Sequence, residues 1–428
     1  MLKKINPYKF ITYGFLFSII IGGFLLWLPI SLKEGVEISL LDSYFITISS
    51  ICVTGLSTVD VANTFNIFGV SVIAILIQIG GLGVVCAGLS IILLAGSKIG
   101  IKERILIKES LNVNTLKGIV KLVLSIFKIT FIIELIGSVV VFFGFKKYYD
   151  FKNAIIISIF HSISSFNNAG FDLIGNYKNL TPFKNDFIIN FATSFLIILG
   201  GLGFLVIKDV IEKKSFIKLT LHSKIVITTT LILIFVGTFL IWITQDISLI
   251  GAYFASVTTR TAGFNTYDYS LFNNVGLIIL MILMFIGASP SSTGGGIKTT
   301  SLYIMIKGTL SICSNKKCHS FKRYITLETI NKAYIILFLG ILVVLFSTFG
   351  LCLFEKDISF INLLFESISA FATVGLSNGV TPQLCSISKI IIMITMFIGR
   401  VGALTLISTW SKKGKTNVQY PEENIMIG

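Results

Sequence analysis

Charged side chains are scarce in this sequence, and their scarcity excludes an ordinary soluble domain. Asp, Glu, Lys and Arg make up 13% of the 428 residues, whereas hydrophobic residues make up 54%. Soluble globular proteins contain about 25% charged residues. The composition therefore indicates an integral membrane protein.

Histidine and cysteine are also few, which argues against a catalytic or metal centre. His161, His222 and His319 lie in unrelated parts of the sequence, so clustered acid and base groups of a membrane-embedded enzyme are not indicated. The six cysteines are scattered and form no disulfide framework. Cys313, Cys318 and His319 supply three zinc ligands at most, without a fourth. We expect neither an enzyme nor a bound cofactor.

A phosphate-binding loop is missing as well. The segment GGGIKTT at 294–300 looks like one, but that motif needs Gly, Lys and Ser or Thr in direct succession after a strand. Here Ile297 separates the glycine from Lys298, and apolar sequence flanks the segment. We therefore do not expect this chain to bind a nucleotide.

Long hydrophobic runs, by contrast, are abundant. Eight of them are long enough to cross a hydrocarbon core about 30 Å thick as a helix. They cover 9–29, 66–95, 119–143, 187–207, 225–243, 271–287, 333–353 and 387–410. The first is too long for the apolar part of a signal peptide and lacks a small-residue cleavage site. The sequence predicts an all-α polytopic membrane protein with eight spans.

The net charge of +15 follows the topology that eight spans imply. With both termini in the cytoplasm, the inner segments hold 22 Lys and Arg residues and the outer loops hold 8. The inner segments are 1–9, 97–121, 208–224, 313–332 and 411–428, and the outer loops are 31–60, 144–186, 244–270 and 354–382. This bias is the positive-inside rule. The basic excess thus indicates orientation in the cell membrane rather than binding to nucleic acid.

A polar, glycine-centred motif occurs four times. Its copies are CVTGLST at 52–58, NNAGFD at 167–172, TRTAGFNT at 259–266 and ATVGLSN at 372–378. A second glycine signature begins 24 to 30 residues after each central glycine, within QIGGLGVV, ILGGLGFL, FIGASPSS and FIGRVGAL. Two signatures at a near-constant offset predict four structural repeats. We place the repeats at 8–97, 117–210, 222–312 and 330–411, followed by a cytoplasmic tail at 412–428.

A short apolar segment precedes each central glycine. The four segments are 12 to 14 residues long and cover 41–52, 153–166, 248–259 and 360–371. They are too short to cross a bilayer, which favours re-entrant half-helices. Non-helical backbone at membrane depth is tolerated only where protein buries it or water lines it. We therefore expect four helix–pore-loop–helix units, related by pseudo-symmetry, around a central pore.

The chemistry of the loops indicates what passes through that pore. Their centres offer few ionisable groups, so backbone carbonyls are the available ligands, and glycine permits the positive φ that turns a carbonyl inward. A ring of carbonyls replaces the hydration shell of potassium. The predicted filter comprises Val53, Thr54, Gly55, Asn168, Ala169, Gly170, Thr261, Ala262, Gly263, Thr373, Val374 and Gly375. Asp60, Asp172 and Asp268 either concentrate cations at the mouth or are ordinary solvated loop acids.

The third repeat departs from the others at GASPSSTGGGIKTTS, residues 287–301. Proline and three successive glycines do not continue a stable helix. The segment is therefore either a kinked helix or an intramembrane loop that gates the pore. The predicted gate comprises Gly287, Pro290, Gly294, Gly295, Gly296, Lys298 and Arg400.

Arg400 lies in the middle of a predicted span, and Glu134 is the only acidic residue within a predicted span. Arg400 stands where the other repeats have a small residue, and an intramembrane arginine indicates a function. It forms a barrier or a gate anchor at the pore, or it pairs with a structural acid, for which Glu134 is a candidate. We also expect Arg260 to brace its half-helix through Glu366 rather than to bind the ion.

These motifs, with GASPSSTGGGIKTT and IGRVGALTL at the expected positions, resemble the potassium-translocating subunits of the Trk/Ktr/HKT superfamily. The resemblance covers essentially the whole chain. With eight predicted spans and a short amino terminus, the chain resembles the KtrB type rather than the longer TrkG/TrkH type. In this family a glycine in all four loops goes with potassium selectivity, and Gly55 occupies the first loop.

The resemblance implies potassium uptake across the plasma membrane, gated by the intramembrane loop. It also implies a homodimer with one pore per protomer, regulated by a separate KtrA-like cytoplasmic ring that binds nucleotide. Sodium stimulation stays open. The alternatives are a proton-coupled TrkG/TrkH-like transporter, a less selective monovalent cation channel, and a polytopic scaffold that does not transport.

Overall fold

The structure is a computed structural model that describes residues 7–88, 99–111, 116–403, 405–406, 421, 423 and 425–426. Most of the predicted tail at 412–428 lies outside the described residues, as do the ends of the predicted spans 66–95 and 387–410. The described residues are mainly α-helical. Two short strands, β1 (His319–Ser320) and β2 (Arg323–Tyr324), pair antiparallel in a hairpin. The prediction of an all-α polytopic membrane protein is confirmed.

Four helices in the described part of the chain are individually long and apolar enough to cross a membrane. They are α1 (Pro7–Trp27), α7 (Ile119–Phe145), α11 (Leu221–Thr244) and α15 (Leu327–Phe354). The 27 residues of α7 extend about 40 Å at 1.5 Å per residue, more than the hydrocarbon core requires. Each of these helices opens one of the four predicted repeats, which are called units 1 to 4 below.

A short helix occupies each of the four segments predicted as half-helices. These are α2 (Leu40–Ile51), α8 (Phe151–Phe166), α12 (Leu249–Thr258) and α16 (Phe360–Ala372). Polar caps start three of them, because the side chains of Ser39, Asp150 and Ser248 accept backbone N–H bonds from the first turn. With 10 to 16 residues, the short helices extend at most about 24 Å, which is too short to cross.

The last helix of each unit is shorter than the sequence predicts. These helices are α4 (Ile67–Leu82), α9 (Phe187–Leu202), α13 (Asn274–Phe285) and α17 (Ser386–Val401). Three of them end at Gly83, Gly203 and Gly402, whose φ values of 80° to 90° are incompatible with a continued helix. After Gly203 the chain turns by 96° into α10 (Phe204–Lys213). The predicted break in the second span of the third unit is therefore accompanied by breaks at these three glycines.

Shorter elements connect the units. They are η1 (Pro29–Ser31), α3 (Val61–Thr64), α6 (Ile101–Ser110), η2 (Thr181–Phe183), η3 (Phe216–Lys218), η4 (Tyr269–Leu271), α14 (Thr299–Cys313) and η5 (Thr381–Gln383). By length and composition, four helices in the described part of the chain could cross a membrane, or five if the bent pair α9–α10 counts as one span. The count of eight spans stays a prediction, as do the boundaries of the repeats.

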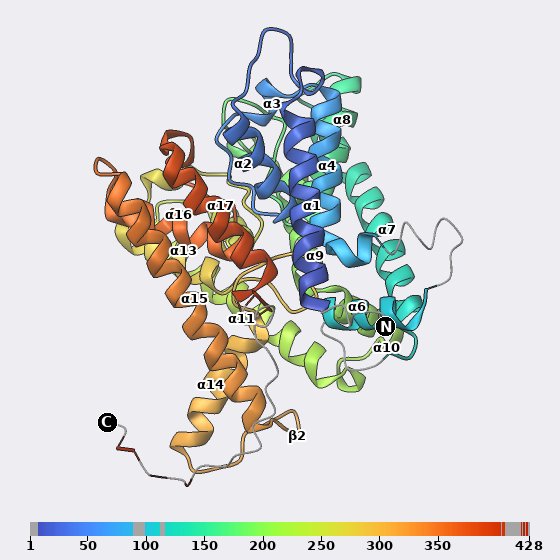
Figure 1. Cartoon of the computed structure of the whole chain (residues 1–428), viewed down its shortest axis with the longest axis vertical. Helices are drawn as coiled ribbons and strands as arrows, with labels where there is room; N and C mark the ends of the chain where they lie inside the picture. Colours follow the sequence, from blue (N-terminus) through green and yellow to red (C-terminus); the bar gives the residue numbers. More distant parts are fainter. Residues whose placement is uncertain are drawn as a thin grey trace.

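The units pack in a closed ring. Figure 1 shows α15, α16 and α17 of unit 4 side by side. Within each unit, the long helix and the last helix both pack against the short helix. Between units, each last helix also packs against the short helix of the next unit: α4 on α8, α9 on α12, α13 on α16 and α17 on α2. The contact of α17 with α2 closes the ring. The four short helices therefore surround one axis, and each ends at its glycine loop.

Candidate functional site

The four central glycines form a ring of their own. All four have a positive φ, between 72° and 94°; they are Gly55, Gly170, Gly263 and Gly375. A Cβ on each would lie within 3.0 Å of a carbonyl oxygen of the next unit; in the same order, these are the oxygens of Ala169, Ala262, Val374 and Thr54. Glycine is therefore required at each position by its φ and by the lack of space for a side chain.

A second left-handed residue stands two positions before each glycine. These residues are Val53, Asn168, Thr261 and Thr373, with φ of 57°, 58°, 78° and 51°. Positive φ is uncommon for any side-chain-bearing residue, and for β-branched valine and threonine it is a true outlier. Such strain costs about 1–3 kcal/mol per residue and persists only where the surrounding structure enforces it. All four loops thus share one imposed backbone shape.

The N–H groups of the loops are bonded back to the short helices. Backbone N–H groups of Thr54, Ala169 and Val374 donate to the carbonyl five residues earlier, at 2.7 to 2.9 Å. The hydroxyls of Ser49 and Ser369 accept from the N–H groups of Gly55 and Gly375 at 3.0 and 3.1 Å. Because the N–H groups are satisfied on the helix side, the loop carbonyls are free to face the ring.

The carbonyl oxygens in the ring have no matching donors. The residues that carry them are fully buried, and in the described part of the chain no N–H or O–H donates to these oxygens; they are Thr54, Ala169, Ala262 and Val374. Buried carbonyls almost always have a hydrogen-bond partner. Four unpaired, buried carbonyls in a closed ring therefore form a site suited to a cation that has shed its water.

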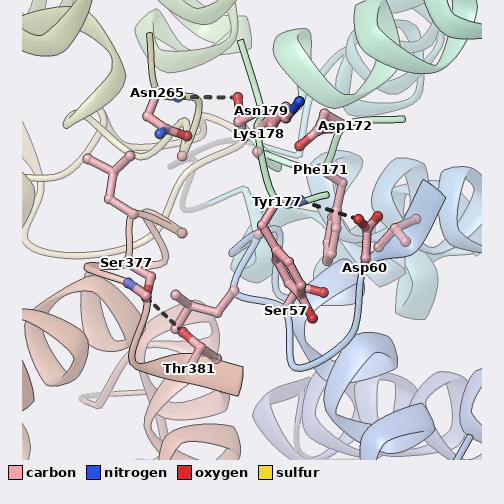
Figure 2. A pocket seen from close by; sticks show the side chains of 18 of the residues that line it. Ser57, Asp60, Phe171, Asp172, Tyr177, Lys178, Asn179, Asn265, Ser377 and Thr381 are labelled. Carbon is pink, nitrogen blue, oxygen red and sulfur yellow. Dashed lines mark hydrogen bonds between the residues drawn. The ribbon is translucent and has the colours of Figure 1, made fainter. Parts of the chain in front are cut away.

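A cavity of about 510 Å³ adjoins the ring (Figure 2). All four central glycines line it, together with residues that follow them in the chain, including Asp60, Asp172 and Asp268. The loops around it are tied across units. The N–H of Tyr177 donates to Asp60 at 3.3 Å, and the N–H of Asn265 donates to the Asn179 side chain at 3.2 Å. The structure thus gathers the three predicted mouth acids around one cavity.

Among these acids, Asp172 has an altered pKa. Burial raises the pKa of its carboxyl to about 6, the negative charge of Asp60 acts in the same direction, and the N–H of Ile174 counteracts them. Its charge therefore changes in the range between mildly acidic and neutral pH.

An irregular segment, 286–298, separates α13 from α14 and settles the choice between a kinked helix and a loop. This intramembrane loop contacts the residues that precede the central glycines, whereas the cavity is lined by those that follow them. The Gly295 N–H donates to the Thr373 hydroxyl at 2.9 Å, and a Cβ on Gly294 would collide with Thr261. The loop therefore lies against the other face of the ring.

Two cations hold the intramembrane loop. Lys298 Nζ donates to the carbonyl oxygens of Gly294 and Gly295 at 2.6 and 3.2 Å. The Arg400 guanidinium donates to the carbonyl oxygens of Thr293 in the loop and Gly80 in α4. Arg400 thus bridges the loop to unit 1, and its partners are carbonyls rather than Glu134.

The second glycine signature has a packing role. A Cβ on Gly80, Gly200 or Gly399 would lie within 3.0 Å of the carbonyl oxygen of Ile51, Phe166 or Phe371, respectively. Each of these carbonyls belongs to the residue four positions before a central glycine. The signature therefore marks the close crossing of the last helix with the end of the short helix in the same unit.

One further expectation, the pairing of Arg260 with Glu366, turns out differently. Arg260 donates to the Thr230 hydroxyl at 3.3 Å, and Glu366 instead accepts from Thr381 at 3.0 Å and from Ser377. The expected pairing of Arg260 with Glu366 is wrong, because the carboxylate is held by hydroxyls of the segment that follows Gly375. In the described ranges, no three His, Cys, Asp or Glu residues are placed to hold a metal ion.

The structure also brings in residues that sequence reasoning missed. Gln78 and Asn167 surround the Glu134 carboxylate, and the hydroxyl of Ser291 donates to the carbonyl of Leu111 at 2.7 Å. The Asn-Asn pair at the start of the second loop is a feature of the sequence that could have indicated a role for Asn167. Nothing in the pattern of the sequence points to the contact of Ser291, which joins segments 180 positions apart.

The chain is similar to known proteins along its whole length. Ktr system potassium uptake protein B of Bacillus subtilis (strain 168) is 36% identical over 438 residues, which is 99% of this chain and 97% of the relative. Potassium/sodium uptake protein NtpJ of Enterococcus hirae is 36% identical over 444 residues, 100% of this chain and 98% of the relative. Ktr system potassium uptake protein B of Vibrio alginolyticus is 35% identical, with coverages of 98% and 94%.

A solved structure shares the fold. The crystal structure of the potassium transporter TrkH from Vibrio parahaemolyticus superposes with a TM-score of 0.75, at 16% sequence identity, over 96% of this chain and 86% of the other. Residues 7–419 match the family TrkH, described as "Cation transport protein". The predictions of a KtrB-type member of the superfamily and of a transporter rather than an enzyme are confirmed. The chain belongs to the TrkH family of cation transport proteins.

Proposed function

We propose that the chain takes up potassium across the plasma membrane through the ring of glycine loops. The observation that carries the proposal is the set of four buried carbonyl oxygens without donors, one per unit, in a closed ring. Carbonyl oxygens in this arrangement replace the hydration shell of a monovalent cation. The full-length relatives from Bacillus subtilis and Vibrio alginolyticus are named potassium uptake proteins, which supports the choice of ion.

The proposed filter consists of the residues two before, one before and at each central glycine. The short helices add to its preference for cations, because each ends at a loop and a helix C-terminus carries about half a negative charge. The three acids around the outer cavity, Asp60, Asp172 and Asp268, raise the local concentration of cations before they enter.

We assign the intramembrane loop, 286–298, to the gate. It lies against the inner face of the ring, and Lys298 and Arg400 hold its carbonyls. The two positive charges there oppose a cation resting below the filter. Opening requires the loop to leave Thr373 and to release Arg400. A cytoplasmic nucleotide-binding ring, docked on the basic inner segments, is the proposed regulator of that movement, and the proposed orientation puts both termini in the cytoplasm.

Uptake in cells that lack their own potassium uptake systems tests the proposal. Expression of the chain should restore growth at low external potassium and uptake of potassium or rubidium. Measurement with and without external sodium separates sodium-stimulated uptake from independent uptake. Absence of uptake by membrane-inserted, folded protein, also when a KtrA-like subunit is supplied, would falsify the assignment.

A second candidate function is a less selective monovalent cation pathway. The observation in its favour is the similarity to the Enterococcus hirae relative, which is named a potassium/sodium uptake protein. Competition between sodium and rubidium in the same cells distinguishes the two functions: a selective filter admits rubidium in a large excess of sodium, and a non-selective filter does not.

A further inference from the structure

Glu134 lies buried in α7, and its carboxylate contacts neither Arg400 nor any other cation in the described residues. Both of its oxygens accept amide hydrogens instead. Asn167 Nδ2 donates to Oε1 at 2.8 Å, and Gln78 Nε2 donates to Oε2 at 3.2 Å. The triangle is closed by a bond of 2.9 Å from Asn167 Nδ2 to Gln78 Oε1. Three helices from two units meet here: α4 of unit 1, and α7 and the end of α8 of unit 2.

The comparison of units shows that the fold does not need this carboxylate. The Glu134 carbonyl accepts from the hydroxyl of Ser162 in α8 at 2.7 Å. In unit 3, the Ile234 carbonyl accepts from the hydroxyl of Ser256 in α12 at 3.0 Å. Glu134 and Ile234 thus occupy matching places against their short helices. Since buried isoleucine suffices in unit 3, the cost of burying a polar carboxylate in unit 2 calls for a separate explanation.

The partner of Glu134 leads directly into the second filter loop. Asn167 caps the end of α8 and is followed by Asn168, which has φ of 58°, Ala169 and Gly170. On its other side, the Asn167 side chain lies against Gly81, where a Cβ would collide with it. Asn167 is therefore wedged between Gly81 and the Glu134 carboxylate. The matching positions in the other units hold Cys52, Arg260 and Ala372, so this carboxylate brace belongs to unit 2.

We propose that Glu134 is a positioning residue for ion selectivity: it holds Asn167, and through it the second filter loop, in the shape that the ring requires. This inference rests on the proposed function. A residue in a left-handed conformation relaxes once its surroundings stop enforcing that shape. Loss of the carboxylate frees the Asn167 amide, lets Asn168 leave positive φ, and turns the Ala169 carbonyl away from the ring.

The test compares potassium and sodium uptake per folded molecule in Glu134→Leu with wild type. Leucine matches the apolar residue of unit 3, so the helix should still fold. We expect the potassium preference to fall about tenfold, and the half-saturating potassium concentration to rise, because two hydrogen bonds to a carboxylate are lost. Glu134→Gln keeps the bond with Asn167 but turns an amide toward Gln78, so its effect should be smaller.

An exchange variant separates positioning from general packing. Gln78→Glu combined with Glu134→Gln moves the carboxylate to the other corner of the triangle, where it still accepts from Asn167. We expect this double variant to recover most of the potassium preference. The control is Thr130→Val, one turn away on α7, where a buried hydroxyl has no partner among the described residues; its uptake should match wild type.

Two results would overturn the inference. One is wild-type selectivity and half-saturation in Glu134→Leu, whatever its expression level. The other is an exchange variant no more selective than Glu134→Leu. A folding defect alone changes the amount of active protein and leaves the ratio of the ions constant, which also counts against positioning. Wild-type protein that takes up no potassium would instead contradict the proposed function.

Discussion

At the scale of single residues, the central glycines meet two independent demands. Positive φ is costly for an L-residue, by about 1–2 kcal/mol, and a Cβ would also collide with a carbonyl of the next unit. The first demand acts within the loop, and the second links one loop to another. A substitution at one glycine should therefore displace the carbonyl of its neighbour.

We predict that Gly375→Ser weakens the preference for potassium over sodium by about tenfold or more, since 1.4 kcal/mol corresponds to a factor of ten. The Cβ would push against the Thr54 carbonyl, which belongs to the proposed filter. Uptake affinities for both ions, measured at equal amounts of folded protein, check the result. Gly118→Ser is the matched control, because Gly118 also has positive φ, 74°, but nothing lies within 4 Å of a Cβ there. Equal ion ratios in both variants would contradict the filter.

Asp172 should make uptake at low potassium depend on pH. Because burial raises its pKa to about 6, with Asp60 nearby, the carboxylate is charged above that pH and becomes neutral below it. Uptake should therefore fall on acidification from pH 7.5 to 5.5, by about threefold for one charge lost near the mouth. Asp172→Asn should be slow at both pH values and show a flatter profile. Asp246→Asn, at an exposed acid outside the cavity, should keep the wild-type profile, and an unchanged profile in Asp172→Asn argues against a role in concentrating cations.

At the scale of elements, the last helix of each unit shows which features follow from the local sequence and which follow from tertiary contacts. The hydrophobic runs predict that these helices exist, but not that Gly83, Gly203 and Gly402 end three of them. Apolar flanking sequence favours continuation. A Cβ on Gly203 would lie 2.7 Å from the Pro290 carbonyl oxygen of the intramembrane loop, whereas a Cβ on Gly83 would meet nothing within 4 Å. Likewise, Pro290 and the glycines around 294–296 indicate a break, and tertiary contacts, among them those with Thr373 and Arg400, place the resulting loop against the ring of central glycines.

The guanidinium of Arg400 should hold the intramembrane loop in its closed position. Its guanidinium reaches Thr293 and Gly80 at once, a geometry that a lysine ammonium cannot reproduce. We expect Arg400→Lys to raise basal flux about tenfold although the charge survives, because a hydrogen bond to a charged group contributes about 1.5–3 kcal/mol. Flux in proteoliposomes without a regulatory subunit measures this, with Arg323→Lys in the exposed hairpin as control. If Arg400→Gln is fast and Arg400→Lys is not, the residue acts as a charge barrier and not as an anchor.

At the scale of the whole molecule, two sets of contacts close the ring, one between helices and one between the central glycines and neighbouring carbonyls. The last helix of each unit packs on the next short helix, and each central glycine packs on the next carbonyl, in the same direction around the axis. The residues of the proposed pore therefore all come from one chain. A second copy is not needed to complete the ring, so assembly and conduction are separable.

We predict a homodimer with one complete pore per protomer, as the resemblance to KtrB-type subunits implies. Cross-linking in native membranes should trap a species of two chains, and its yield should not depend on the expression level. Co-expression of wild type with the filter variant Gly375→Ser should give a mixture of two independent ion preferences, since each ring is intact or altered as a whole. Single chains in membranes that carry full uptake would contradict the dimer.

The sequence by itself determined the membrane class, the four glycine motifs and their repetition, because hydrophobic length and the need for positive φ are properties of short segments. It also placed the four short helices to within a few residues, and it identified Arg400 and the broken third unit as unusual. These features depend on local chemistry and can be predicted without knowing which residues are in contact in the fold.

Only the tertiary structure decided which residues meet. The partners of Arg400 are carbonyls of unit 1 and the intramembrane loop, and those of Glu134 are amides on α4 and α8. Arg260 and Glu366, which sequence reasoning paired, bind separate hydroxyls. The physical reason is that every residue has a backbone carbonyl, so the sequence does not distinguish the carbonyls that accept hydrogen bonds from those that do not. Which carbonyls are left unpaired, each beside the central glycine of the preceding unit, follows only from the closure of the ring.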